Sequence, residues 1–141
     1  IRENPDAAQA LFDSCTISTV GVAFGSYNVF SPAALNSIGS VTYRCTWFIF
    51  SGQITVDLSQ GNGTYASRQL RRGTEPLLYN LYLNAAATQI WGNGTGGSQR
   101  YGPTTTPNGQ NVTVNIFGRI PPGQDVTVGN YTDAIVATIN F

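Results

Sequence analysis

The strongest constraint on the fold is the alternation of apolar and polar residues in the last stretch of the chain, residues 131–141. Alternation with a period of two residues is typical of a β-strand that buries one face. The face that we expect to be buried carries Tyr131, Ile135, Ala137, Ile139 and Phe141. Because no residue follows this strand, we expect one of its edges to lack a neighbour from its own chain. Which strand completes that edge is the central functional question of the sequence.

The composition indicates a single domain with few charges. The chain has 141 residues, enough for one hydrophobic core but not for two. Charged residues make up 10% of the chain, and seven Arg balance seven Asp and Glu. A neutral chain without a basic cluster is poorly suited to nucleic acid or to anionic membranes. No apolar run reaches the length of a membrane span, and the longest apolar cluster, residues 47–50, is expected at a strand end or in an exposed patch.

Two cysteines, Cys15 and Cys45, allow either one disulfide or a free pair in the cytosol. The lysine-free composition, rich in Thr, Asn, Gly and Tyr, favours a secreted protein with the disulfide. Residues 1–5 lack the basic and apolar regions of a signal peptide. If the protein is secreted, we expect this sequence to be the mature chain.

The rest of the chain shows strand patterns separated by Gly, Pro and Asn, and no convincing helix. Two short stretches, residues 5–12 and 84–88, could each form a turn of helix, which is too short to change the fold class. About seven short strands with such punctuation indicate an all-β sandwich or a barrel. The clearest strands are expected at residues 16–24, 39–46, 53–58, 77–83, 111–120 and 131–141.

Catalytic chemistry has little support in the sequence. The chain has no His, which removes the usual general base and the commonest metal ligand, and two cysteines alone make no zinc site. We therefore predict that the protein is not an enzyme and needs no metal or cofactor. Trp91 and Asn93, beside a glycine-rich loop, could form a sugar-binding loop, but core packing of Trp91 is the favoured interpretation. Asp133 lies on the inward face of the last strand, where we expect it to cap the preceding turn by accepting backbone N–H groups.

Several motifs, taken together and in this order, resemble the spore coat protein U domain, which builds the subunits of archaic chaperone–usher pili. They run over residues 15–18, 22–27, 39–45, 79–82, 90–92, 117–124, 129–133 and 135–141. The resemblance implies an immunoglobulin-like β-sandwich that lacks its own final strand, with a disulfide between its first two strands. It also implies a pilin domain at residues 15–141, exported through the bacterial periplasm to an extracellular fimbrium. A strand donated by a periplasmic chaperone, and later by the next subunit after passage through an outer-membrane usher, would complete the fold.

The resemblance assigns the open groove to two edge strands. Their expected groove residues are Val20, Val22, Phe24, Ile135, Ala137, Ile139 and Phe141. Leaving about five such side chains exposed would forgo roughly 1.5–3 kcal/mol each, a sum comparable to the whole stability of a domain. A donated strand supplies the missing contacts and hydrogen bonds, and head-to-tail repetition gives a filament.

The expected donor is the N-terminal arm, residues 1–14, which could span roughly 45 Å when extended. Its apolar residues alternate more weakly than in the arms of the family, on faces that carry Ile1, Ala8, Ala10, Leu11 and Phe12. The main prediction is a structural pilus subunit in an adhesive or biofilm fibre. The alternatives are a binding domain at the tip of such a fibre, and a surface or coat protein that completes its own fold as a monomer.

Overall fold

The computed structural model describes residues 12–141, and all of its regular structure is β. The expected donor residues Ile1, Ala8, Ala10 and Leu11 lie outside the described residues. The strands are β1 (Ser14–Val20), β2 (Leu35–Thr46), β3 (Gln53–Leu58), β4 (Arg68–Arg72), β5 (Glu75–Tyr82), β6 (Tyr101–Thr105), β7 (Asn111–Ile120) and β8 (Ala137–Asn140).

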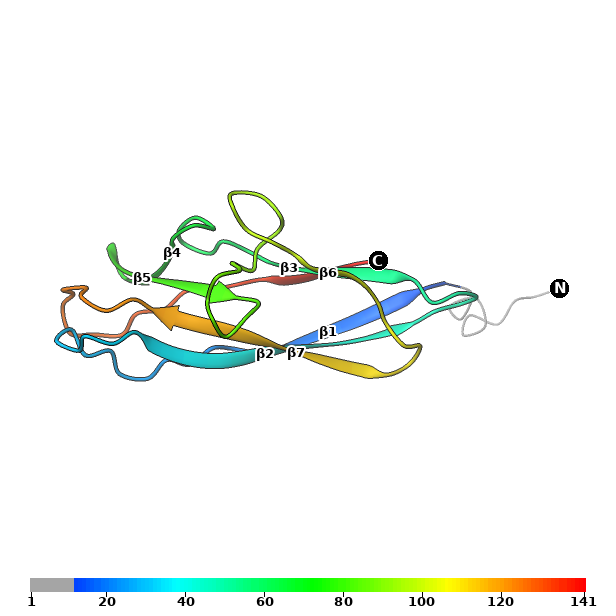
Figure 1. Ribbon diagram of the computed structural model, residues 1–141, viewed down its shortest axis with the longest axis horizontal. Helices are drawn as coiled ribbons and strands as arrows, with labels where there is room; N and C mark the ends of the chain where they lie inside the picture. Colours follow the sequence, from blue (N-terminus) through cyan, green and yellow to red (C-terminus); the bar gives the residue numbers. More distant parts are fainter. Residues whose placement is uncertain (1–11) are drawn as a thin grey trace.

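The strands form two antiparallel sheets that pack face to face as a sandwich (Figure 1). One sheet has the order β1-β2-β7-β5-β4, and the other has the order β6-β3-β8. Alternate residues of β2, β3, β5 and β7 point into the space between the sheets, as the period of two predicts. The core consists of Val41, Tyr43, Cys45, Trp47, Ile54, Val56, Leu58, Leu77, Tyr79, Leu81, Trp91, Ile116 and Ile120.

The molecule is elongated along its strands, so that it has two distinct ends (Figure 1). The start of β1 and the connection from β2 to β3 lie at one end. The loops between β1 and β2 and after β7, drawn in blue and orange, lie at the other end. At the first end the apolar cluster of residues 47–50 is split: Trp47 is buried, whereas Phe48, Ile49 and Phe50 are exposed. The expectation of an exposed patch is confirmed for these three side chains.

The first strand is shorter than the sequence pattern predicts. Residues 14–20 pair with β2, but the chain leaves the sheet after Val20 instead of continuing to Phe24. Gly39 of β2 lies directly below this point, where an added Cβ would approach the Val20 carbonyl oxygen to 2.5 Å. Residues 21–28 join no ladder, and the side chains of Val22 and Phe24 lie over Gly118 of β7.

Candidate functional site

Two strand edges remain open where the sheets meet. Among residues 12–141, β1 pairs only with β2 and β8 pairs only with β3. The two strands lie close to each other, but no hydrogen-bonded ladder joins them. Open edges of this kind present rows of backbone donors and acceptors to an incoming strand.

The open edges border a continuous groove. Its narrow part, about 360 Å³, lies between residues 19–24 and 133–137, and its floor is formed by Leu58, Leu70, Tyr79, Leu81 and Ile116. Its wide part, about 840 Å³, lies between residues 22–30 and 126–133. The two parts share Val22, Phe24, Leu70 and Asp133, so they form one cleft along the side of the sandwich.

Both walls of the groove contain backbone groups that are not hydrogen-bonded to another strand. Residues 22–27 make no backbone–backbone hydrogen bond with any described residue; the Ala23 carbonyl accepts only the Ser37 hydroxyl, at 2.6 Å. On the other wall, Val136 turns both its N–H and its carbonyl toward Ser59, next to β3. Since backbone groups alternate in direction along a strand, those of Ile135 and Ala137 point to the open edge. The groove therefore offers hydrogen bonds from both sides.

The structure brings most of the expected groove residues together. Val20, Val22, Phe24, Ile135 and Ala137 line the cleft, and Ile139 packs half-buried against the core. Their function as a strand-binding edge stays a prediction.

The expected inward position of Phe141 is wrong, because its side chain is 61% exposed. The alternation ends at Asn140, the last residue paired with β3, and the Phe141 ring instead lies edge-on to Trp47 at a centroid distance of 6.3 Å.

Asp133 is held in place in the wall of the groove, where the two parts meet. Its Oδ1 accepts the backbone N–H groups of Asn62 at 3.0 Å and of Ala134 at 2.8 Å, and its Oδ2 accepts the Tyr79 hydroxyl at 2.7 Å. Burial, with this hydrogen bond as the second cause, raises the pKa of Tyr79, so the phenol remains a donor. The sequence correctly predicted that Asp133 accepts backbone N–H groups, but the loop that it caps is the one after β3, which is distant in sequence.

Behind the groove lies Arg68, a fully buried side chain that the sequence reasoning missed. Its guanidinium donates to the carbonyls of Ser59 and Trp91, at 2.7 and 2.6 Å, and to Asn80 Oδ1 at 2.8 Å. Burial is the main cause that lowers the pKa of Arg68, and the charge of Asp133 opposes the shift. The contacts tie β4 to the end of β3 and to the segment around Trp91.

The outer rim of the wide part is fixed by Glu75. Its carboxylate accepts the Thr127 hydroxyl and the Thr127 N–H, the latter at 3.2 Å, and the Tyr131 hydroxyl at 2.7 Å. These hydrogen bonds, with that from the Thr127 hydroxyl contributing most, lower the pKa of Glu75. The loop of residues 126–131 is thereby held against the turn between β4 and β5.

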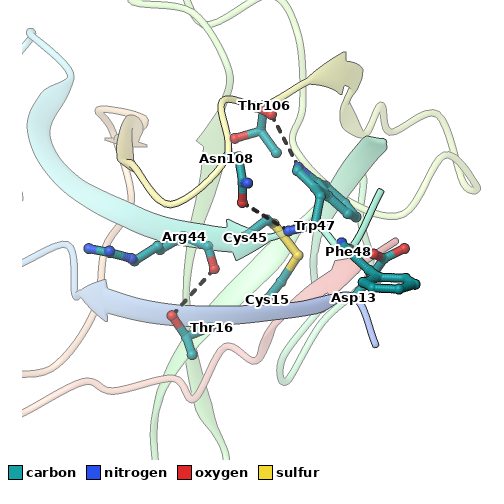
Figure 2. Close-up of a disulfide and its surroundings, with 9 residues drawn as sticks. All are labelled: Asp13, Cys15, Thr16, Arg44, Cys45, Trp47, Phe48, Thr106 and Asn108. Carbon is teal, nitrogen blue, oxygen red and sulfur yellow. Dashed lines mark hydrogen bonds between the residues drawn. A yellow bond between two sulfur atoms is a disulfide. The ribbon is translucent and has the colours of Figure 1, made fainter. Parts of the chain in front are cut away.

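The disulfide between Cys15 and Cys45 is confirmed, and it joins β1 to β2 near the root of the N-terminal arm (Figure 2). Next to it, the Phe48 N–H donates to Asp13 Oδ1 at 2.8 Å. Phe12, the only expected donor residue among those described, is 69% exposed. The chain thus leaves the sandwich at a fixed point, at the end opposite the wide part of the groove.

The alternative of a sugar-binding loop is not supported at Trp91. Its ring is fully buried, donates its indole N–H to the Val56 carbonyl at 2.9 Å and packs against Tyr101, so it presents no face to a sugar. Core packing, the favoured interpretation, is what the structure shows. The Asn93 side chain accepts the N–H and the hydroxyl of Thr95 and so closes a local turn.

Within residues 12–141, no group of three or more His, Cys, Asp or Glu side chains could hold a metal ion. The same part of the chain contains no helix long and apolar enough to span a membrane.

Comparison with known proteins identifies the family. The profile described as Spore Coat Protein U domain matches residues 2–138. The chain is also 31% identical over 147 residues to Protein U of Myxococcus xanthus, covering 91% of this chain and 78% of that protein. The chain belongs to the spore coat protein U domain family.

A solved structure shares the fold. It is a chain of the CsuC–CsuE chaperone–tip adhesion subunit pre-assembly complex from archaic chaperone–usher Csu pili of Acinetobacter baumannii. The TM-score is 0.60 at 20% identity, and the match covers 92% of this chain and 40% of that one, so this chain spans about two fifths of its length. At this identity the likeness concerns the fold, an immunoglobulin-like β-sandwich.

Proposed function

We propose that this chain is a structural subunit of an archaic chaperone–usher pilus, which polymerises by donor-strand complementation into an extracellular adhesive fibre. The observation that carries the proposal is the continuous groove between two unpaired strand edges. A strand inserted there would pair with backbone groups on both walls and place alternate side chains on the apolar floor. Membership in the spore coat protein U domain family and the fold shared with a chain of a Csu pilus complex support this assignment.

The proposed partners follow from the order of assembly. Before polymerisation, the strand would come from a periplasmic chaperone, and an outer-membrane usher would exchange it for the arm of the next subunit. The described chain begins at the end of the sandwich where β1 starts (Figure 1). The wide part of the groove is lined by residues 22–30 and 126–133, which belong to the loops at the other end. An arm that reaches into a neighbour's groove makes a head-to-tail contact, which does not close and gives a filament. The role is structural, and no cofactor takes part.

Removal of residues 1–11 tests the proposal and leaves the contact between Asp13 and Phe48 in place. The truncated chain should still fold with its chaperone but should not extend a fibre, as measured by electron microscopy and by the size of the assemblies. A matched control replaces residues 1–11 with a Gly/Ser segment of equal length, and it should fail in the same way. Normal fibres from either variant would contradict the proposal.

A domain at the tip of the fibre is a second candidate, which the exposed side chains of Phe48, Ile49 and Phe50 favour, because apolar patches mark interaction sites. A tip domain accepts a strand but need not donate one. The truncated chain would then enter fibres at one end only, as often as the full chain does. A self-completed monomer, the remaining alternative, predicts a single species in sedimentation at all dilutions.

A further inference from the structure

The floor of the groove is apolar except where the Tyr79 hydroxyl donates to the Asp133 carboxylate. Asp133 lies where the narrow and the wide parts meet, and it borders both of them. The side chains around it on the floor, Leu58, Leu70 and Leu81, offer no hydrogen bonds. A strand that fills the whole groove must therefore pass over a single carboxylate.

This carboxylate cannot move aside when the groove is filled. Both of its oxygens are hydrogen-bonded, to Tyr79 and to the backbone of Asn62 and Ala134. Gly61 lies directly behind it, and a Cβ added there would approach Asp133 Oδ2 to 2.2 Å. The position of the charge is thus fixed from three sides before any strand arrives.

The fixed carboxylate distinguishes between the side chains that can cover it. Its three hydrogen bonds and the charge of the buried Arg68 compensate part of the loss of water. A large apolar side chain would remove the remaining hydration and give nothing in return, which is unfavourable for a charged group. A small side chain leaves room for water or for the backbone of the donated strand.

The middle of the N-terminal arm has such small side chains. Ala7, Ala8 and Ala10 occupy both alternating faces, whereas the bulky Leu11 and Phe12 come later. A polar point in the groove explains why an arm with so few large apolar residues could still fit. This agreement links a property of the arm sequence to one side chain of the groove.

We propose that Asp133 sets the register of the donated strand, by requiring that one of Ala7, Ala8 and Ala10 lies opposite its carboxylate. The proposal rests on the proposed function, because it assumes that the arm of one chain enters the groove of another. Asp133 is in this sense a specificity-determining residue of the groove. Tyr79 and Gly61 are positioning residues that act through it.

A cycle of substitutions in the full chain tests the proposal. Each alanine is changed in turn (Ala7→Leu, Ala8→Leu, Ala10→Leu), both in the natural background and together with Asp133→Ala. The rate of fibre assembly and the denaturant resistance of the fibres are measured. We expect one leucine to slow assembly about tenfold in the natural background, and Asp133→Ala to restore assembly for that position alone.

Two further variants separate register from folding. Asp133→Asn keeps the size and one acceptor oxygen for the backbone N–H groups, and the Tyr79 hydroxyl can accept from the new amide N–H. This variant should fold like the natural chain and tolerate the same leucine. Asp125→Ala removes an exposed acid that does not line the groove, and it should rescue none of the leucine variants. A merely structural role of Asp133 would not produce compensation at a single position of the arm.

Equal effects of Asp133→Ala at all three positions, or no coupling at any of them, would overturn the register assignment while leaving the proposed function intact. If the natural full chain forms no fibres at all, the proposed function and this inference both fail. The truncation of residues 1–11 distinguishes the two cases, because it tests the arm without reference to Asp133.

Discussion

Replacement of the buried Arg68 by leucine should strongly destabilise the sandwich. Within residues 12–141, the carbonyls of Ser59 and Trp91 accept hydrogen bonds from the Arg68 guanidinium and from no other side chain. Leucine fills part of the space but leaves both carbonyls without a partner. Arg68→Lys keeps the charge, but a single ammonium group cannot replace a planar fork that reaches Ser59, Trp91 and Asn80 together.

The magnitude follows from the groups left unpaired. Each buried carbonyl without a donor costs about 1–3 kcal/mol. Removing the cation also removes its own desolvation penalty, which offsets part of the loss. We expect a net loss of about 3 kcal/mol for Arg68→Leu, equivalent to a fall in Tm of roughly 10 °C for a chain of this size. Arg68→Lys should lie between this variant and the natural chain.

Urea denaturation of the full chain with its disulfide oxidised measures these differences. Arg44→Leu is the matched control, because Arg44 lies in β2 with an exposed side chain, and its free energy of unfolding should change by less than about 0.5 kcal/mol. If Arg68→Leu unfolds at the same urea concentration as the natural chain, the buried hydrogen bonds contribute no net stability and the reasoning is wrong.

Three other perturbations have defined outcomes. Cys15→Ser should lower the free energy of unfolding by about 3–4 kcal/mol in urea, because the native link closes a loop with a sequence separation of 30; a change below about 1 kcal/mol would argue against this. Hydrogen bonds lower the pKa of Glu75 in the folded chain. The ionised Glu75 carboxylate should therefore stabilise the fold fully above the unfolded pKa of about 4.3, and this stabilisation should be lost as the pH falls through the lower pKa of the folded state. Hydrogen exchange at the Thr127 amide should accordingly become less protected toward low pH, relative to the intrinsic rate, and Glu75→Gln should abolish this pH dependence. Gly118→Ala should displace the wall of the groove and weaken fibre assembly, since a Cβ there would lie 2.6 Å from Val22 Cγ1; unchanged assembly would show that this wall does not contact the donated strand.

The sequence predicted those strands whose apolar alternation is supported by pairing on both sides or by the core. The bounds of β3 and β7, residues 53–58 and 111–120, agree with the expectation. The alternation of burial over residues 131–140 is also confirmed, yet only Ala137–Asn140 form a strand. Periodicity indicates which face a segment buries, whereas a strand needs a continuous ladder, and residues 131–136 make only isolated backbone contacts, at Thr132 with Arg71 and at Val136 with Ser59.

Other features left no periodic signal. The strand β6 was missed because residues 101–105 contain Gly102, Pro103 and three polar or aromatic neighbours without apolar alternation. The sequence around Arg68 gives no sign that this side chain is buried, since Arg side chains are rarely fully buried. Its burial depends on carbonyls from three distant segments, which no local pattern encodes. The position of Asp133 within the groove likewise depends on the loop at Gly61 and on Tyr79 in β5.

The central claim is that the groove between residues 19–30 and 126–137 receives a strand from another molecule. A structure of the assembled protein, with the edge beside Val136 and Ile139 resolved, tests it most directly. We expect residues of the N-terminal arm of a neighbouring chain to run along this edge and to form hydrogen bonds with the backbone of Ile135 and Ala137. An empty groove, or one filled by residues of the same chain, would contradict it.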